Sequence, residues 1–124
     1  MYKYLLILVV FVAGCSIMDY QKADLSMYSG HQGYLDQQIS PGIHIIEITQ
    51  RGGYQFGFDN KKLLSKLAEY WDRRASELCP NGYEGESKAI LALNAKIPAF
   101  QCNKNFCQGY PVVSGIVKCI DENT

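Results

Sequence analysis

The apolar and polar positions of the chain first separate a short apolar leader from everything that follows. Leu5 to Ala13 form an unbroken apolar run between Lys3 and Gly14-Cys15. A helix rises about 1.5 Å per residue, so this run covers only about half of a hydrocarbon core roughly 30 Å thick and cannot span it. A basic residue, a short apolar run and small residues, in that order, are typical of a secretory signal peptide. We therefore predict that residues 1–14 are a cleaved signal peptide, the alternative being a buried strand.

The next segment, residues 15–39, is polar and rich in tyrosine, and its apolar positions repeat at neither helical nor strand spacing. A terminal segment without periodicity is typical of a tether. We predict that 15–39 forms this tether and that one small domain occupies residues 40–124.

The domain is predicted to open with a turn at Ser40-Pro41-Gly42 and a strand over residues 43–50, where β-branched residues dominate. Over residues 54–58, aromatic residues alternate with polar or small ones. This stretch fits either the second arm of a hairpin or an extended entry into a helix, and the pattern leaves both open.

Residues 60–79 carry the clearest helical pattern, with apolar residues on one face and charged residues on the other. The predicted packing stripe consists of Leu64, Leu67, Ala68, Trp71, Ala75 and Leu78. Asp59 or Asn60 is available as the N-cap, and Pro80-Asn81-Gly82 ends the helix. We interpret the charged face as solvated surface rather than a docking site.

Two further strands are predicted over residues 89–102 and 110–120, joined by a polar loop. Pro98 limits its part of the first strand to an edge or a bulge, and Pro111 fits near a strand start. The predicted fold class is α+β, in which one long amphipathic helix packs on a small antiparallel sheet of three or four strands.

The cysteines predict disulfide bonds, because an exported chain meets an oxidising environment. Beyond Cys15, the chain holds Cys79, Cys102, Cys107 and Cys119, an even number. A zinc site with four thiolates is the alternative, but such sites usually contain two tight ligand pairs, and the spacing here supplies one at best. An antiparallel hairpin of the last two strands favours the pairs Cys102–Cys107 and Cys79–Cys119 among three connectivities.

Charge and motifs argue against several classes of function. The whole chain has a formal net charge of zero, and loss of Lys3 with the signal leaves about −1. We therefore expect no overall basic field that recruits nucleic acid or anionic lipid. His31 and His44 have no accompanying nucleophile signature, and the Cys102-x4-Cys107 spacing differs from that of thioredoxin-like sites. We predict no enzymatic activity, no metal and no cofactor.

The end of the leader carries a recognisable motif. Val12-Ala13-Gly14-Cys15 resembles the lipobox of bacterial lipoproteins. The resemblance implies that Cys15 is diacylated and becomes the first residue of the mature protein, which is then held on the membrane by its acyl chains. By the same analogy, Ser16 favours the outer membrane, with the domain facing the periplasm.

A second resemblance covers most of the remaining chain. The order Gly33-Tyr34, Pro41-Gly42, Gly52-Gly53, the helix end 74–78 and Gly82-Tyr83 is similar to a widespread group of small uncharacterised bacterial lipoproteins. The late cysteines depart from that pattern, and no functional residue is carried over.

These observations predict a lipid-anchored protein of the cell envelope that acts as a non-enzymatic binding or envelope-sensing module. Its partners are expected to be the membrane, through Cys15, and an envelope protein whose identity the sequence leaves open. The alternative is a structural or accessory subunit of an envelope or secretion assembly. A periplasmic redox or hydrolytic enzyme is the least supported class, because no catalytic constellation accompanies the fold.

Overall fold

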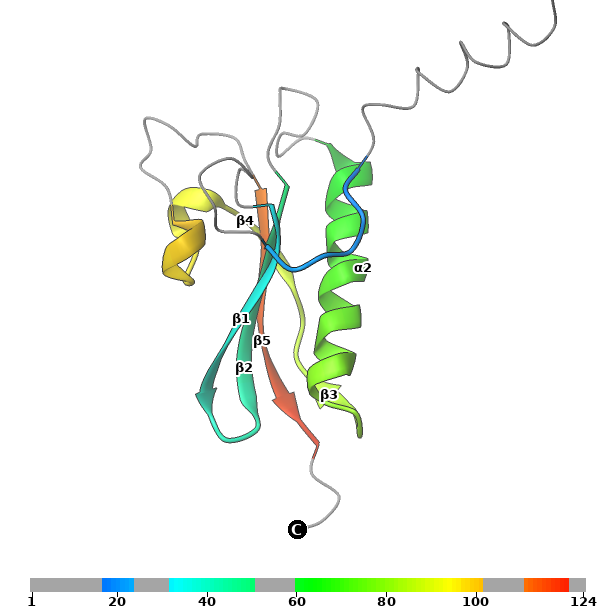
Figure 1. Cartoon of the computed structure of the whole chain (residues 1–124), viewed down its shortest axis with the longest axis vertical. Helices are drawn as coiled ribbons and strands as arrows, with labels where there is room; N and C mark the ends of the chain where they lie inside the picture. The colour runs from blue at the N-terminus through cyan, green and yellow to red at the C-terminus, as the bar shows by residue number, and fades with distance from the viewer. Residues whose placement is uncertain (1–16, 24–31, 51–59, 102–110, 121–124) are drawn as a thin grey trace, which may run out of the picture.

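A computed structural model describes residues 17–23, 32–50, 60–101 and 111–120 of the chain (Figure 1). Within these residues, one α-helix packs on one face of a five-stranded antiparallel sheet. The predicted α+β class is confirmed, with more strands than the expected three or four. The strand order is β1-β2-β5-β3, and β4 also pairs with β5.

The first two strands form a hairpin. β1 (Gly33–Ser40) pairs with β2 (Ile43–Thr49) around the Pro41-Gly42 turn, where Gly42 has a positive φ of 75°. β2 confirms the strand expected over 43–50. The predicted tether over 15–39 is wrong from Gly33 onward, because these residues form β1, in which the polar run Asp36-Gln37-Gln38 hides the alternation of a strand.

The helix α2 (Lys61–Leu78) confirms the predicted helix, and the Asn60 side chain caps it by accepting a hydrogen bond from the Leu63 N–H at 3.0 Å. Its fully buried stripe is Leu63, Leu67, Trp71 and Ala75. The expected stripe included Leu64 in place of Leu63, which is wrong, because a regular four-residue step backward from Trp71 reaches Leu67 and Leu63. Leu64 is only partly buried.

The main core lies between α2 and the sheet. The strand residues Ile46, Ile48, Val113 and Val117 are buried against the helix. Trp71 fills the centre of this layer, and its indole Nε1 donates a hydrogen bond to the carbonyl oxygen of Ile46 at 3.0 Å. A Cβ at Gly115 would lie 2.7 Å from the Trp71 ring, so only glycine allows this approach of the indole to β5.

The last third of the chain differs most from expectation. The predicted long strand over 89–102 is wrong, because β4 (Lys88–Leu91) is followed by two short 3-10 helices, η3 (Ala92–Asn94) and η4 (Pro98–Phe100). Pro98 begins η4, a position at which its missing N–H leaves no hydrogen bond unmade.

The C-terminal strand was predicted well. β5 (Pro111–Cys119) corresponds to the expected strand over 110–120 and pairs antiparallel with β4, so the predicted pairing of these segments is confirmed. The two-residue strand β3 (Tyr83–Glu84), which the sequence did not predict, pairs with the last residues of β5.

A second, smaller core covers part of the other sheet face. It consists of Ala23, Ala92, Ala95, Phe100 and Val112. The η3 and η4 segment therefore serves as a lid on the upper end of the sheet, opposite α2 (Figure 1).

Candidate functional site

The segment that follows the predicted lipidation cysteine, residues 17–23, is packed into the domain. It is the blue trace that starts beside the first turn of α2 in Figure 1. Met18 is 7% exposed, its N–H donates to Gln50 Oε1 at 2.8 Å, and its carbonyl accepts from the Tyr70 hydroxyl at 2.7 Å. This part of the predicted tether is therefore a docked segment, and that expectation is wrong here as well. The segment is mostly polar in sequence, so the burial of Met18 was not predicted.

The same segment then joins the edge of β1. The Ala23 N–H donates to the Tyr34 carbonyl at 2.9 Å, and the Tyr34 N–H donates to the Gln21 carbonyl at 3.0 Å. Gly33 makes this approach possible, because its φ is +128° and a Cβ there would lie 2.6 Å from the Ala23 nitrogen. Backbone pairing and a glycine thus fix where the segment meets the sheet.

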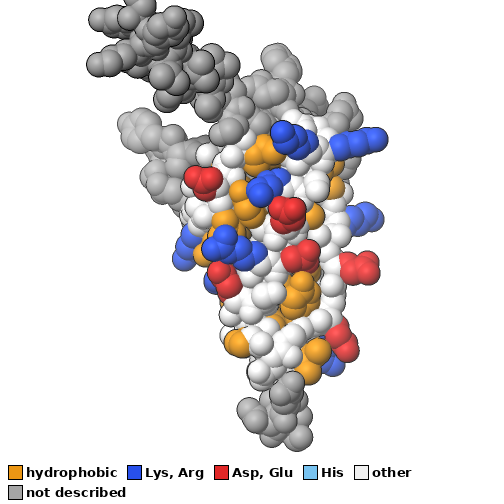
Figure 2. Space-filling view, turned by 90° about the vertical axis from the view of Figure 1, so that its right-hand side faces the viewer, with side chains coloured by type: hydrophobic (Ala, Val, Ile, Leu, Met, Phe, Trp, Pro, Cys, Tyr) orange, Lys and Arg blue, Asp and Glu red, His pale blue; other side chains and the backbone are white. Residues whose placement is uncertain are grey.

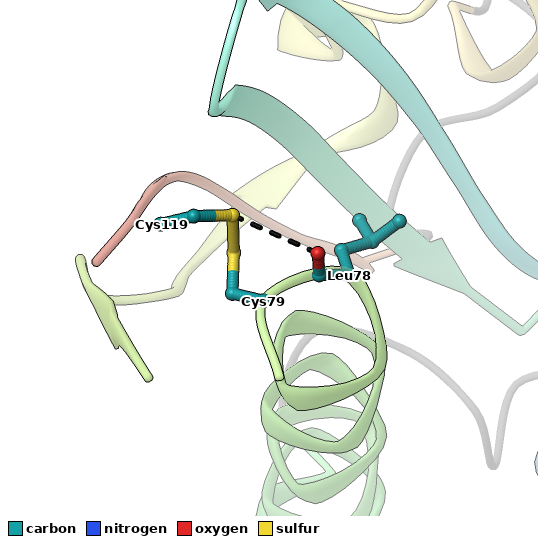
Figure 3. The surroundings of a disulfide bond; sticks show 3 residues. All are labelled: Leu78, Cys79 and Cys119. Carbon is teal, nitrogen blue, oxygen red and sulfur yellow. Dashed lines mark hydrogen bonds between the residues drawn. A yellow bond between two sulfur atoms is a disulfide. The ribbon is translucent and has the colours of Figure 1, made fainter. Parts of the chain in front are cut away.

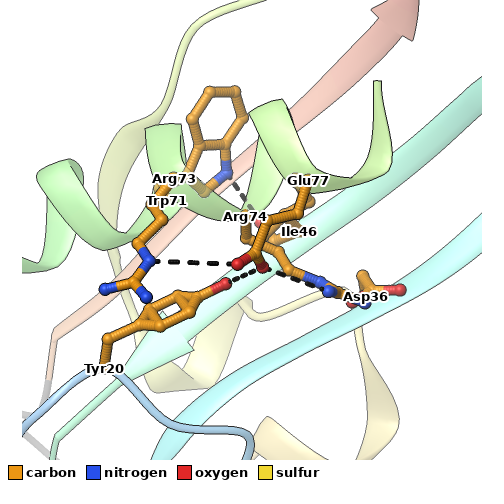
Figure 4. Close-up of polar contacts among 7 residues, drawn as sticks. All are labelled: Tyr20, Asp36, Ile46, Trp71, Arg73, Arg74 and Glu77. Carbon is orange, nitrogen blue, oxygen red and sulfur yellow. Dashed lines mark hydrogen bonds and ion pairs between the residues drawn. The ribbon is translucent and has the colours of Figure 1, made fainter. Parts of the chain in front are cut away.

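Side chains around Tyr20 form the polar part of the docking contact (Figure 4). The Tyr20 hydroxyl donates to Glu77 Oε1 on the last turn of α2. The Tyr20 ring stacks on the Tyr34 ring with centroids 5.0 Å apart, and the Arg73 guanidinium lies 4.1 Å above the Tyr20 ring centroid. The ring is therefore held between a strand residue and a helix residue.

Arg74 connects α2 to β1 beside this ring. Its Nε lies 2.7 Å from Asp36 Oδ2, and its Nη1 lies 3.3 Å from Glu77 Oε1. Its guanidinium also lies 4.7 Å above the Tyr34 ring centroid. Cationic, anionic and aromatic groups therefore contact one another in this partly buried layer. Its hydrogen bonds join charged groups, and such bonds are stronger than those between neutral groups.

The pKa values of this cluster follow from its contacts. Burial and the hydrogen bond to Glu77 raise the pKa of Tyr20, and that same hydrogen bond lowers the pKa of Glu77. Burial of Arg74 favours a lower pKa, but its hydrogen bond and charge interaction with Asp36 outweigh burial and raise it. At neutral pH Tyr20 is therefore a neutral phenol that donates to an ionised Glu77, and Arg74 is a cation.

The Cys79–Cys119 disulfide closes the other end of the molecule (Figure 3). The two Cα atoms are 5.0 Å apart, and the bond joins the C-cap of α2 to the end of β5. The predicted Cys79–Cys119 pairing is confirmed. Cys15 and the predicted pair Cys102–Cys107 lie outside the described residues.

An open hollow of about 440 Å³ lies beside this disulfide. Its lining includes Pro41, Ile43, Leu78, Cys79, Lys118 and Ile120. Among the described residues that line it, the one charged side chain is Lys118, on β5. The hollow is therefore mainly an apolar recess.

Glu47 is a buried carboxylate that the sequence reasoning missed. It is fully buried, accepts hydrogen bonds from the Lys96 and Ile97 N–H groups at 2.9 and 2.7 Å, and accepts one from Ser114 Oγ at 2.7 Å. These donors fix the lid segment to the sheet. The only sequence signal was an acidic residue within the otherwise apolar strand IHIIEIT.

The catalytic and metal-binding expectations can be placed on the described chain only in part. His44 lies on β2, opposite Val117 and Gln38 in the strand register, and is not a member of the Tyr20 cluster, while His31 lies outside the described residues. Among residues 17–23, 32–50, 60–101 and 111–120, no three His, Cys, Asp or Glu side chains are grouped so that they could hold a metal ion.

Comparisons with protein-family models, with curated protein sequences and with solved structures found no match to this chain. In the described part of the chain, no helix is both long enough and apolar enough to cross a bilayer.

Proposed function

We propose that this chain is a lipid-anchored protein of the cell envelope whose small domain binds or senses another envelope component without catalysis. The observation that carries the proposal is Val12-Ala13-Gly14-Cys15, which lies at the end of a short apolar run and is followed two residues later by a docked segment. The disulfide between Cys79 and Cys119 agrees with an oxidising compartment.

Acyl chains on Cys15 would supply the attachment. Each buried CH₂ contributes about 0.8 kcal/mol, and stable anchoring takes two chains or one chain with a second signal. Cys15 precedes Ile17 by two residues, so an extended chain places their Cα atoms at most about 7 Å apart. With Ile17 and Met18 packed on the core, the domain is held at the membrane surface rather than at the end of a long tether.

The polar cluster around Tyr20 supports a holding role. Its carboxylates and guanidinium groups bind one another across the docked segment, α2 and β1. A catalytic cluster instead directs its groups toward a space that a substrate occupies. The cluster therefore favours a domain that keeps its anchor segment in a fixed position.

Intact mass spectrometry of the membrane-extracted protein tests this proposal. The expected mature chain begins at Cys15, carries an acyl mass, and gains alkyl groups at its remaining cysteines only after reduction. A Cys15→Ser variant should lose the acyl mass and the membrane attachment together. An uncleaved leader, or cysteines that alkylate freely without reductant, would contradict the envelope assignment.

Mild crosslinking followed by co-purification separates binding or sensing from the alternative of an assembly subunit. A stoichiometric partner under all growth conditions indicates a subunit. Contacts that appear only under envelope stress indicate sensing.

A further inference from the structure

The charges at the two ends of α2 are reversed relative to its dipole. The first turn holds Lys61 and Lys62 and no acidic residue, and the last turn holds Glu77 and no basic residue. The amino end of a helix carries partial positive charge and the carboxyl end partial negative charge, so both placements disfavour the helix. Each therefore needs a reason beyond helix formation.

The reason for Glu77 is visible in the structure. Its carboxylate accepts the Tyr20 hydroxyl hydrogen bond and pairs with Arg73 and Arg74, which holds the anchor segment on the helix. Lys61 and Lys62 differ, because both are exposed and neither forms an ion pair with another described residue. No contact within the described residues explains why lysines stand at this helix end.

The position of these lysines indicates that partner. α2 begins at the end of the molecule where the chain enters at Ile17 (Figure 1). One turn further, Lys66 Nζ pairs with Glu69 at 3.3 Å and lies 5.4 Å from the ring centroid of Tyr70. The Tyr70 hydroxyl in turn donates to the Met18 carbonyl. Figure 2 shows blue side chains projecting at this same upper end. The basic side chains therefore lie beside the point at which the predicted anchor joins the domain.

We propose that Lys61, Lys62 and Lys66, here called the basic end, contact the anionic headgroups of the membrane that holds Cys15. This inference rests on the lipid anchor proposed above. The anchor keeps Ile17 within about 7 Å of Cys15, and so brings this end of the domain close to the bilayer surface. Attraction between an ammonium group and an anionic headgroup persists over a screening length of about 8 Å at physiological ionic strength, so the basic end would orient the domain on the bilayer.

The test uses the acylated protein in vesicles of phosphatidylcholine, alone or mixed with phosphatidylglycerol. An amine-acylating reagent labels the lysines, and mass spectrometry measures the rate at each position. In the anionic vesicles, Lys61 and Lys62 should react about fivefold more slowly, the factor expected for a lysine beside an anionic surface. Lys118, at the disulfide end, should react equally fast in both. Salt at about 1 M, where the screening length falls to about 3 Å, should remove the protection.

A pair of charge-matched variants sharpens the test. Lys61→Glu/Lys62→Glu should fold, because acidic residues suit the first turn of a helix, and should abolish the lipid-dependent protection of Lys66. Lys88→Glu/Lys118→Glu changes the charge equally on β4 and β5 and should leave that protection intact.

The outcomes separate this inference from the anchor itself. The first outcome is equal labelling of Lys61 and Lys62 in both kinds of vesicle, in a sample whose intact mass includes the acyl chains. It would contradict lipid contact by the basic end but not the lipid anchor. An intact mass without acyl chains overturns both. Protection that depends on anionic lipid and on low salt, in the acylated sample, supports both.

Discussion

The Tyr20 hydroxyl donates a hydrogen bond to Glu77, a residue 57 positions later on the last turn of α2. The contact joins the segment next to the predicted anchor to the end of the helix that packs on the sheet. Since Met18 is also buried in the main core, movement of the anchor segment and the integrity of the domain are coupled. A tether of the predicted length would have separated them.

Replacement of Tyr20 by phenylalanine should lower the free energy of unfolding by about 1 kcal/mol, because one hydrogen bond to a charged acceptor is lost while the ring stays. Hydrogen exchange at the Ala23 amide, which pairs with Tyr34, should become faster. Tyr83→Phe is the matched control. It removes a hydroxyl that donates to Asp72 over 3.0 Å, and this hydrogen bond does not involve the anchor segment. Equal effects of both variants on the Ala23 amide would contradict the docking role.

The same contact predicts a pH window. The pKa of Glu77 is lowered in the fold, so its contribution is present above the unfolded value of about 4.3 and is lost as the pH falls below it. The pKa of Tyr20 is raised, so its contribution is present below about pH 10 and is lost as the pH rises above that value. Urea unfolding of wild type and Tyr20→Phe should therefore differ most between these limits and converge once the pH has fallen through the lowered pKa of Glu77. A constant difference at every pH would show that the hydrogen bond is not responsible.

Gly33→Ala should release the anchor segment from β1. The added Cβ would lie 2.6 Å from the Ala23 nitrogen and 2.7 Å from the Gln21 carbonyl oxygen, and the backbone is held at a φ of +128°. Limited proteolysis should cut the variant within residues 17–23 much faster than the wild type. Gly42→Ala is a useful control, because Gly42 also has a positive φ but a Cβ there meets nothing within 4 Å. If both variants are cut at the same rate, close approach at Gly33 does not hold the segment.

The elements predicted correctly are those whose signals are local or repeat at a fixed period. The helix appears in the sequence because its buried residues recur every turn, and the Cys79–Cys119 pair follows from a hairpin that returns beside the helix end. The strand β1 was missed because the consecutive polar side chains Asp36, Gln37 and Gln38 interrupt the alternation that marks a strand.

The polar contacts of the site have no local signature. Glu47 binds backbone amides about fifty residues away, and every residue except proline carries such an amide. The partner of Tyr20 is likewise fixed only by how the segment crosses α2. Long-range contacts of this kind follow from the assembled fold, which is why the sequence indicated a tether where the structure has a docked segment.

Glu47→Ala should lower the free energy of unfolding by about 3 kcal/mol, because it leaves the buried Ile97 N–H and the part-buried Lys96 N–H without an acceptor. Ser114→Ala should cost about 1–3 kcal/mol, since it removes one donor from a carboxylate that keeps the others. Glu84→Ala, at an exposed acidic position on β3, should change stability by less than about 0.5 kcal/mol. Urea denaturation of the three variants measures the ranking, and a Glu47→Ala value close to that of Glu84→Ala would contradict the anchoring of the lid.

Lys61→Glu should make the domain more stable by about 0.3–1 kcal/mol, since it places negative charge at the amino end of α2. Lys66→Glu should have the opposite sign, because Lys66 Nζ pairs with Glu69 at 3.3 Å and the variant puts two carboxylates together. Thermal unfolding at low ionic strength gives both shifts. A Lys61→Glu variant less stable than the wild type would remove the argument that this lysine is kept for a purpose other than folding.

Loss of the Cys79–Cys119 bond should lower the free energy of unfolding by about 4 kcal/mol. Without the bond the unfolded chain regains the conformational entropy that closing a loop of this length removes. The two residues are 40 positions apart, and the bond fixes the end of α2 to the end of β5. The double variant Cys79→Ala/Cys119→Ala should therefore shift the urea midpoint strongly, whereas Cys102→Ala/Cys107→Ala, which opens a much shorter predicted loop, should shift it less. Reductant added to the wild type should reproduce at least the larger shift. A midpoint that stays unchanged in Cys79→Ala/Cys119→Ala would mean that packing of Trp71 and its neighbours alone secures the helix to the sheet.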